Sequence, residues 1–233
     1  MIEKLSWDSE KFQLEIGKFQ ANEKEDLNRF LLSDKSAFDL IYIFCSPALS
    51  QSESDWFSNQ NLSLLDRRQN FIRQVPDDER IETDPKIRPV SSLSDELLDL
   101  AFQSGTHSRF KTDKRLDPGI FKMLYRTWIT RSVNKEIALE VFGYFEGETL
   151  VGLITYGIKN NAGDVGLISV DSSQRGKGLG KKLINRVIAQ TQKDGLNTLT
   201  VATQGLNTGA IGFYQSCGFR VAGEVDVYHF WTI

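Results

Sequence analysis

The sequence has few of the residues that build metal sites and disulfide frameworks. Its 233 residues include two cysteines, Cys45 and Cys217, and two histidines, His107 and His229. The cysteines are far apart and lie in apolar surroundings, which argues against a disulfide framework and rules out a cysteine-rich metal site. Two widely separated histidines also argue against a histidine-based zinc site. We therefore expect no metal cofactor.

Long apolar runs and a strong charge of one sign are missing as well. No run approaches the ~18 apolar residues of a membrane span, and the first residues lack the apolar region of a signal peptide. The net charge is −3 with the two signs interspersed, which gives no support to nucleic-acid or membrane-surface binding. Apolar residues make up 40% of the chain, enough for a packed core. We expect a globular, cytoplasmic protein with neither nucleic acid nor membrane as a partner.

The chain is expected to form two unequal parts. Residues 1–84 contain short strand-like runs, at 38–44 and 62–66, separated by polar stretches. Residues 76–85 are charged, contain two prolines and lack apolar periodicity, which is typical of a linker. We predict a smaller N-terminal α/β domain over 1–84, which shapes an acceptor pocket or a homodimer interface, and a second domain over 85–233.

After the linker, the order of the elements can be predicted from apolar periodicity and from turn and capping residues. The central strands are joined by short turns, so we expect them to be antiparallel. In chain order, the expected elements are a strand at 87–90, a helix from Ser94 to Gly105, a helix opened by Pro118, strands at 137–145, 149–158 and 165–170, a helix from Leu179, a strand at 198–203, a helix at 208–216 and final strands near Val221 and at 225–231.

The most informative motif is the run Gln-Arg-Gly-Lys-Gly-Leu-Gly-Lys-Lys at 174–182, between a buried-strand pattern and an amphipathic helix. The free N–H groups and the positive dipole at a helix start favour an anion, and glycines let it approach the backbone. A Walker loop is excluded because Arg175 replaces its first glycine and Lys182 its Ser or Thr, and a dinucleotide fingerprint because Lys181 replaces its third glycine. The run therefore predicts a pyrophosphate-binding loop.

This pattern resembles the coenzyme A motif of the GCN5-related N-acetyltransferase (GNAT) superfamily. The run at 207–219 is similar to the second motif of that superfamily, Asn-x-x-Ala-x-x-x-Tyr-x-x-x-Gly-Phe, and the order of the elements matches too. The resemblance implies an α/β GNAT fold, with a mixed, mostly antiparallel twisted sheet flanked by helices, and acetyl-CoA as cosubstrate. The predicted cofactor-binding residues are Ile168, Ser169, Val170, Arg175, Gly176, Lys177, Gly178, Leu179, Gly180, Lys181, Asn207 and Ala210.

The chemistry of acetyl transfer assigns further roles. An amine attacks the thioester carbonyl, so negative charge develops on the carbonyl oxygen and a thiolate leaves. We expect a backbone N–H near Ser169 or Val170 to stabilise that oxygen. Tyr214, whose hydroxyl the superfamily places near the sulfur, is the predicted general acid. The base is left open between Asp164, Asp66 and water.

The acceptor is predicted from a closer resemblance. The runs at 5–8, 108–110 and 199–208, and the aromatic helix after Pro118, are similar to the bacterial TDP-fucosamine acetyltransferase family. That resemblance implies the amino group of a dTDP-linked 4-amino-4,6-dideoxy sugar as the acceptor. The basic loop at 109–115 offers guanidinium groups to a diphosphate, but it departs from that family, so the sugar and nucleotide are left open. The predicted substrate-binding residues are Arg109, Phe110, Thr203 and Gln204.

Alternatives stay open beside this prediction. A GNAT enzyme acting on a protein N-terminus, a polyamine or a drug amine would favour an acidic acceptor groove over a basic one. A non-catalytic acyl-CoA-binding module would keep the glycine loop but would not need Tyr214. The charges of the loop at 109–115 are equally typical of a solvated surface loop. His107, beside this loop, is either a base or an incidental surface residue.

Overall fold

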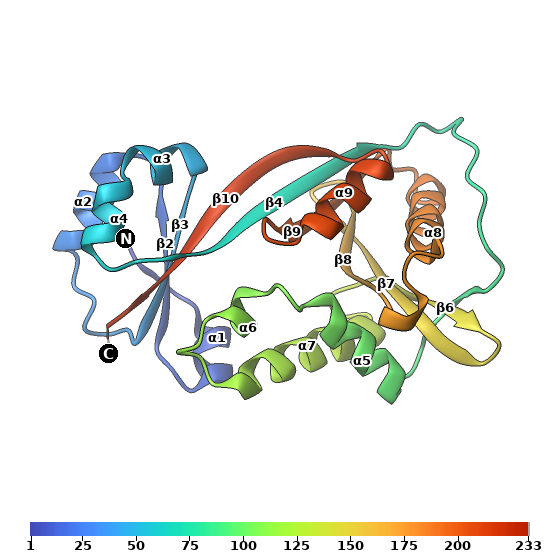
Figure 1. Ribbon diagram of the computed structural model, residues 1–233, viewed down its shortest axis with the longest axis horizontal. Coiled ribbons are helices and arrows are strands. Elements are labelled where there is room, and N and C mark those ends of the chain that lie inside the picture. The colour runs from blue at the N-terminus through green and yellow to red at the C-terminus, as the bar shows by residue number, and fades with distance from the viewer. Residues whose placement is uncertain (233) are drawn as a thin grey trace. The chain divides into compact units, whose positions relative to one another are not determined.

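Two long strands, β4 (Leu64–Gln74) and β10 (Arg220–Trp231), contribute residues to both of the units into which the chain divides. The computed structural model describes residues 1–232 (Figure 1). Unit 1 contains Met1–Gln69, Gln204–Leu206 and the chain from Gly223 on, and unit 2 contains Asn70–Thr203 and Asn207–Ala222. The separate folding of 1–84 and 85–233 stays a prediction.

Unit 1 is a small α/β layer. Its strands follow the order β1-β2-β3-β10-β4, in which β2 and β3 are parallel and β3 and β10 antiparallel. The buried side chains of three helices, among them Leu27, Phe30, Leu49 and Phe57, pack on one face of this sheet. The remaining elements of unit 1 are β1 (Glu3–Lys4), α1 (Ser6–Phe12), β2 (Ile16–Ala21), α2 (Lys24–Leu32), β3 (Leu40–Cys45), α3 (Pro47–Ser52) and α4 (Ser54–Asn59).

Unit 2 carries the predicted sheet. Its strands follow the order β4-β9-β8-β7-β6-β5. The predicted antiparallel pairing of the three central strands is confirmed, and β8 and β9 are parallel. The elements of unit 2 are β5 (Ile87–Pro89), α5 (Asp95–Ser104), α6 (Arg109–Thr112), α7 (Pro118–Val133), β6 (Glu140–Glu146), β7 (Thr149–Lys159), β8 (Ala162–Val170), the 3-10 helix η1 (Ser172–Gln174), α8 (Leu179–Lys193), β9 (Thr198–Gln204) and α9 (Thr208–Ser216).

Helices cover both faces of the sheet of unit 2 (Figure 1). On one face, Leu183, Val187 and Tyr214 from α8 and α9 pack against strand residues. On the other, side chains of α5 and α7 pack against β6 and β7. Strand β8 contributes to both clusters, because Leu167 packs on the α5 side and Ile168 on the α8 side. This alternation is the two-residue period of a strand buried on both faces.

Most predicted element boundaries in unit 2 agree with the structure. Ser94 accepts a hydrogen bond from the Leu97 N–H at 3.2 Å and caps α5, and Pro118 opens α7. Two predictions need correction. The two final strands are one strand, β10, which continues through Gly223. The helix α6 was not expected, because one turn is too short to show helical periodicity.

Candidate active site

The predicted pyrophosphate loop lies between β8 and α8, and α8 begins at Leu179 as expected. Gly176 and Gly178 both have a φ of 79°, in the left-handed region that favours glycine. No atom lies within 4 Å of the place where a Cβ would stand on either residue. The loop backbone is therefore open to a ligand at both glycines.

The start of α8 lacks a side-chain cap. Gly178 occupies the N-cap position, and no side chain accepts a hydrogen bond from the first turn. The first N–H groups of a helix have no partner within the helix, and together with the dipole they attract an anion. In the described part of unit 2, each of the other α-helices has a side-chain cap, supplied by Ser94, Ser108, Asp117 or Asn207.

Several cations surround this helix start. Arg175 donates from Nε to the Val170 carbonyl at 3.0 Å, and Lys177 donates to the Gln174 amide oxygen at 2.7 Å. Lys181 is exposed. Lys182, in contrast, forms an ion pair with Asp84 at 2.9 Å, and this contact holds the pKa of Asp84 below its usual range. The oxygens that Arg175 and Lys177 contact are uncharged, so these two side chains and Lys181 keep their positive charge for an anion. Lys182, whose charge is paired with Asp84, supports the fold.

The parallel strands β8 and β9 stay paired over a short stretch only. Their ladder joins Gly163–Val165 to Leu199–Val201, although β8 continues to Val170 and β9 to Gln204. The separation coincides with a bulge in β8 opposite Thr155, whose hydroxyl accepts a hydrogen bond from the Leu167 N–H at 2.8 Å. Bulges commonly lie beside active sites, where they end pairing and redirect side chains. The bulge leaves the end of β8 without β9 as a neighbour in its ladder.

The predicted donor region lies on this separated end of β8. Ser169 is buried, and among the described residues its hydroxyl has no hydrogen-bond partner. A buried hydroxyl without a partner is costly, and in native structures it commonly has a specific explanation such as a catalytic role or a bound water. Ile168 and Val170, on the opposite face, pack on the core beside α8. Ser169 therefore offers a donor group at the place where the strands part.

Tyr214 lies on α9, within the core that joins α8 and α9 to the sheet. Its ring is 5.6 Å from that of Phe71, 5.4 Å from Phe213 and 5.8 Å from Phe219 between centroids. Burial raises the pKa of Tyr214 above its ordinary value of about 10. The phenol therefore keeps its proton throughout the physiological range, as a general acid must before it acts.

Three further predicted cofactor-binding residues make structural contacts at the starts of α8 and α9. Asn207 accepts a hydrogen bond from the Ala210 N–H at 3.1 Å and so caps α9. Leu179 is buried in the core. A Cβ on Gly180 would stand 3.1 Å from the Phe213 ring, so glycine allows α8 to approach α9 closely. These contacts give Asn207, Leu179 and Gly180 structural roles beside the predicted binding roles.

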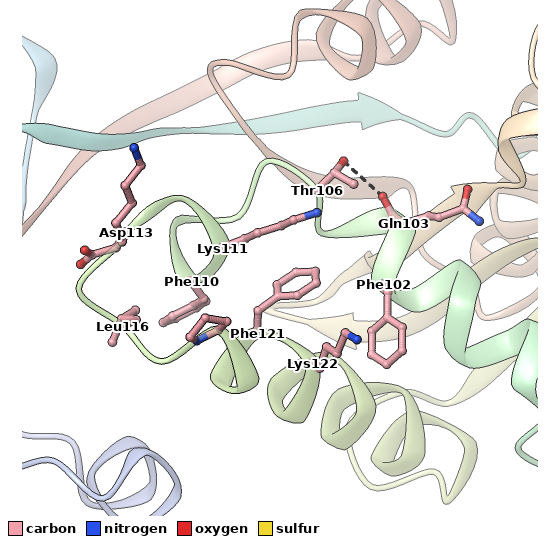
Figure 2. A pocket seen from close by; sticks show the side chains of 11 residues that line it. Phe102, Gln103, Thr106, Phe110, Lys111, Asp113, Leu116, Phe121 and Lys122 are labelled. Atoms are coloured by element: carbon pink, nitrogen blue, oxygen red, sulfur yellow. Dashed lines mark hydrogen bonds between the residues drawn. The ribbon is translucent and has the colours of Figure 1, made fainter.

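A pocket of about 590 Å³ lies in unit 2 at the end of α5, beside α6 and the start of α7 (Figure 2). Its lining contains three phenylalanines, three lysines and one carboxylate, that of Asp113. The Lys111 ammonium lies 5.2 Å from the centre of the Phe121 ring, which is a cation–π distance. The lining residues include Phe102, Gln103, Phe110, Lys111, Lys114, Phe121 and Lys122.

The predicted substrate-binding residues are only partly brought together. Phe110 lines the pocket, and the Arg109 guanidinium lies over the Phe110 ring at 4.3 Å. Thr203 is buried near the end of β9 in unit 2, whereas Gln204 belongs to unit 1. Within the loop at 109–115, Arg109–Thr112 form the short helix α6.

The candidate bases lie in different settings. Asp164 is on the paired part of β8, before the strands part, and accepts a hydrogen bond from the Thr200 hydroxyl at 2.8 Å. Asp66 is buried on β4 in unit 1. His107 is exposed between α5 and α6. The assignment of the base stays open between Asp164, Asp66 and water.

Sequence reasoning missed several residues that line the pocket, among them Phe102, Gln103, Thr106 and Lys122. Phe102 was expected only as an apolar residue of an amphipathic helix, whereas Phe121 belongs to the aromatic helix on which the acceptor resemblance is based. Gln103 and Lys122 stand at polar helix positions that carry no motif. Only the approach of α5 to α7 reveals their common surface, and no local pattern encodes that approach.

Three findings bear on the expected absences. Both cysteines are free and buried. Among residues 1–232, no group of three or more His, Cys, Asp or Glu side chains is placed to hold a metal ion. No helix in the same residues has the length and apolar character needed to cross a membrane.

Comparison with known proteins agrees with this geometry. Residues 106–219 match the model of the "Acetyltransferase (GNAT) family". This part contains the glycine loop, the separated strands and Tyr214. This matched part of the chain has the sequence features of the GNAT family.

One curated relative and two solved structures illustrate the similarity. The chain is 25% identical over 143 residues to the spore coat polysaccharide biosynthesis protein SpsD of Bacillus subtilis, an alignment that covers 61% of this chain and 49% of SpsD. The chain thus spans about half the length of that relative. A conserved protein of unknown function from Staphylococcus epidermidis superposes with a TM-score of 0.65 at 10% identity, over 99% of this chain and 92% of that one. A GCN5-related N-acetyltransferase from Kribbella flavida gives 0.57 at 10% identity, over 93% and 81%. At such identities, the two structures show the shared fold alone.

Proposed function

We propose that this chain is an N-acetyltransferase that moves an acetyl group from acetyl-CoA to the amino group of a dTDP-linked amino-deoxy sugar. The observation that carries the proposal is the start of α8, which has two left-handed glycines, no side-chain cap and three available cations. This arrangement fits the pyrophosphate of coenzyme A, because it offers free N–H groups, the helix dipole and open space.

Bound acetyl-CoA would supply the activated acetyl group, and the residues at the strand separation would act on it. A donor near Ser169 or Val170 stabilises the charge on the carbonyl oxygen. A bond forms between the acceptor nitrogen and the carbonyl carbon, and the bond between that carbon and sulfur breaks. Tyr214 gives its phenolic proton to the sulfur and regains one from solvent. The proton released by the amine goes to water or to one of the candidate carboxylates.

The pocket supports an anionic acceptor that carries a flat ring. Lys111, Lys114 and Lys122 supply positive charge for a diphosphate, and Phe102, Phe110 and Phe121 supply faces for a base or sugar. With three lysines and one carboxylate, that of Asp113, this lining is basic on balance, whereas a polyamine or a cationic drug would favour acidic groups. The curated name of SpsD, spore coat polysaccharide biosynthesis protein, is consistent with a sugar acceptor.

Thiol release from acetyl-CoA tests the proposal, with dTDP-4-amino-4,6-dideoxyhexoses, spermidine and N-terminal peptides as acceptors in parallel. We expect turnover with a nucleotide sugar. Lys122→Gln should raise KM for that sugar about tenfold, whereas Lys193→Gln, at the far end of α8, should not change it. Turnover with spermidine or a peptide alone would keep the enzyme class and overturn the acceptor. Coenzyme A binding without any turnover would indicate a non-catalytic module.

A further inference from the structure

One glutamine side chain holds both ends of the turn that leads into the glycine loop. This turn is η1, with Asp171 directly before it and Arg175 directly after it. Gln103, on α5, donates from Nε2 to Asp171 Oδ2 at 3.2 Å, and its Oε1 accepts from Arg175 Nη2 at 3.1 Å. Because Gln103 comes from a different helix, these two bonds anchor the turn to the body of unit 2.

The chemistry of the three groups explains why the residue is a glutamine. An ionised carboxylate only accepts hydrogen bonds, and a guanidinium only donates them. A primary amide offers one group of each kind, so Gln103 satisfies Asp171 and Arg175 at the same time. A glutamate would repel Asp171, a lysine would repel Arg175, and a leucine would bind neither.

The neighbouring bonds complete a closed network around the turn. Asp171 Oδ1 also accepts from the Ser173 N–H at 2.9 Å and the Ser173 hydroxyl at 2.6 Å. These bonds, the hydroxyl first, hold the pKa of Asp171 below its usual range, so it is ionised at neutral pH. Arg175 Nε is held by the Val170 carbonyl. The guanidinium is thus fixed from two sides and keeps further N–H groups for another partner.

The same residue borders the acceptor pocket. Gln103 belongs to the pocket lining, and its backbone carbonyl accepts from the Thr106 hydroxyl at 3.3 Å. Figure 2 shows the side-chain amide of Gln103 extending away from Lys111 and Thr106. Gln103 therefore belongs to the pocket lining, and its side chain reaches the turn before the glycine loop.

We propose that Gln103 is a positioning residue, which holds Arg175 in the orientation that binds the pyrophosphate of coenzyme A. The inference rests on the proposed function, since it assumes that the loop binds this ligand. An arginine that is already ordered loses less side-chain entropy on binding than a free one. Gln103 acts through Arg175 and needs no contact with the coenzyme.

Calorimetric titration with coenzyme A tests the proposal in a double-mutant cycle. The four proteins are wild type, Gln103→Leu, Arg175→Leu and the double variant. We expect Gln103→Leu to weaken binding about fivefold in the wild-type background and by less than about 1.5-fold when Arg175 is already leucine, because coupled residues give non-additive effects. The matched control is Gln192→Leu. It removes an amide that donates to the Pro76 and Glu79 carbonyls, away from the loop, and should leave coenzyme A binding unchanged.

A compensating pair of substitutions separates positioning from a general structural role. Gln103→Glu keeps an acceptor for Arg175 but faces the Asp171 carboxylate, so it should weaken binding. Adding Asp171→Asn supplies an amide donor to the new carboxylate and should restore affinity to within about twofold of Asp171→Asn alone. A residue needed only for folding would show no such recovery, and thermal melting of each variant checks that the fold is kept.

The outcomes distinguish this inference from the proposed function. If wild type does not bind coenzyme A, the proposed function fails and the inference fails with it. If wild type binds and Arg175→Leu weakens binding, but Gln103→Leu does not, only the inference is overturned. An equal cost of Gln103→Leu with and without Arg175, or no recovery in the compensating pair, also overturns it.

Discussion

Helices α8 and α9 carry the two sequence motifs, yet they begin in opposite ways. Helix α9 has an asparagine cap, Asn207, which satisfies the Ala210 N–H. Helix α8 begins at Leu179, and its N-cap residue, Gly178, has a left-handed conformation and supplies no side-chain cap. A cap stabilises a helix start by about 1 kcal/mol. The cap stabilises the start of α9, whereas the uncapped start of α8 leaves its N–H groups for the anion that we propose to bind there.

The largest effect is expected on α9, at the tyrosine that its capped start positions. Tyr214→Phe removes the phenolic proton donor and should lower kcat about 100-fold, within the range of general acid catalysis. The dissociation constant of coenzyme A should stay within about twofold of wild type. Steady-state kinetics and titration of the same preparation check both values. An unchanged kcat would remove Tyr214 from the chemistry.

A charged substitution at the start of α8 should remove its proposed ability to bind an anion, which the capped start of α9 lacks. Gly178→Asp places a carboxylate where an anion is proposed to bind, and it should weaken coenzyme A binding about 30-fold through charge repulsion and lost space. Gly178→Asn has nearly the same shape without the charge and also tolerates the left-handed conformation. It should weaken binding about threefold. Equal losses for the two variants would show that charge at this position is unimportant.

The converse change at α9 should affect stability more than binding. Asn207→Ala removes the cap and should lower the free energy of unfolding by about 1 kcal/mol, as measured by urea denaturation. Asn207→Asp keeps an accepting oxygen and should retain most of that stability. If Asn207→Ala leaves stability unchanged but weakens coenzyme A binding strongly, the residue is a ligand contact and not mainly a cap.

The smallest expected effect concerns pH. Because burial raises the pKa of Tyr214, its proton is retained above the ordinary tyrosine value. The kcat of wild type should therefore show no loss of the acid form up to pH of about 10. A pH profile of kcat, with Tyr214→Phe as the reference, checks this. A decline with a midpoint below the ordinary tyrosine value, absent from the variant, would contradict the buried setting.

The sequence predicts unit 2 well because its elements begin at local chemical signals. Ser94, Pro118 and Asn207 mark helix starts through bonds or dihedral angles that depend on near neighbours only. The glycine loop is equally local, since Gly176 and Gly178 need only their own backbone conformation. These signals account for the agreement of α5, α7, α8 and α9 with the predicted ranges.

The parts that sequence reasoning misses depend on contacts between distant segments. Gln103 and Arg175 meet only after α5 packs against β8. Lys122 joins the pocket through the approach of α7 to α5. One local feature of the sequence, Gly166 within a strand pattern, is associated with the separation of β8 and β9. The position of the bulge opposite Thr155, however, is set by the register in which β7 and β8 pair. Such features follow from tertiary packing and produce no periodic pattern in the sequence.

An NMR titration of the 15N-labelled protein with coenzyme A shows directly whether the start of α8 binds the coenzyme. We expect the largest amide shifts at Gly176, Gly178, Leu179 and Gly180, whose N–H groups lie in the glycine loop and the first turn of α8. Asn134, just past the far end of α7, serves as a reference whose amide should not move. Absence of shifts in the loop, or larger shifts elsewhere in unit 2, would contradict the claim that the uncapped start of α8 binds the coenzyme.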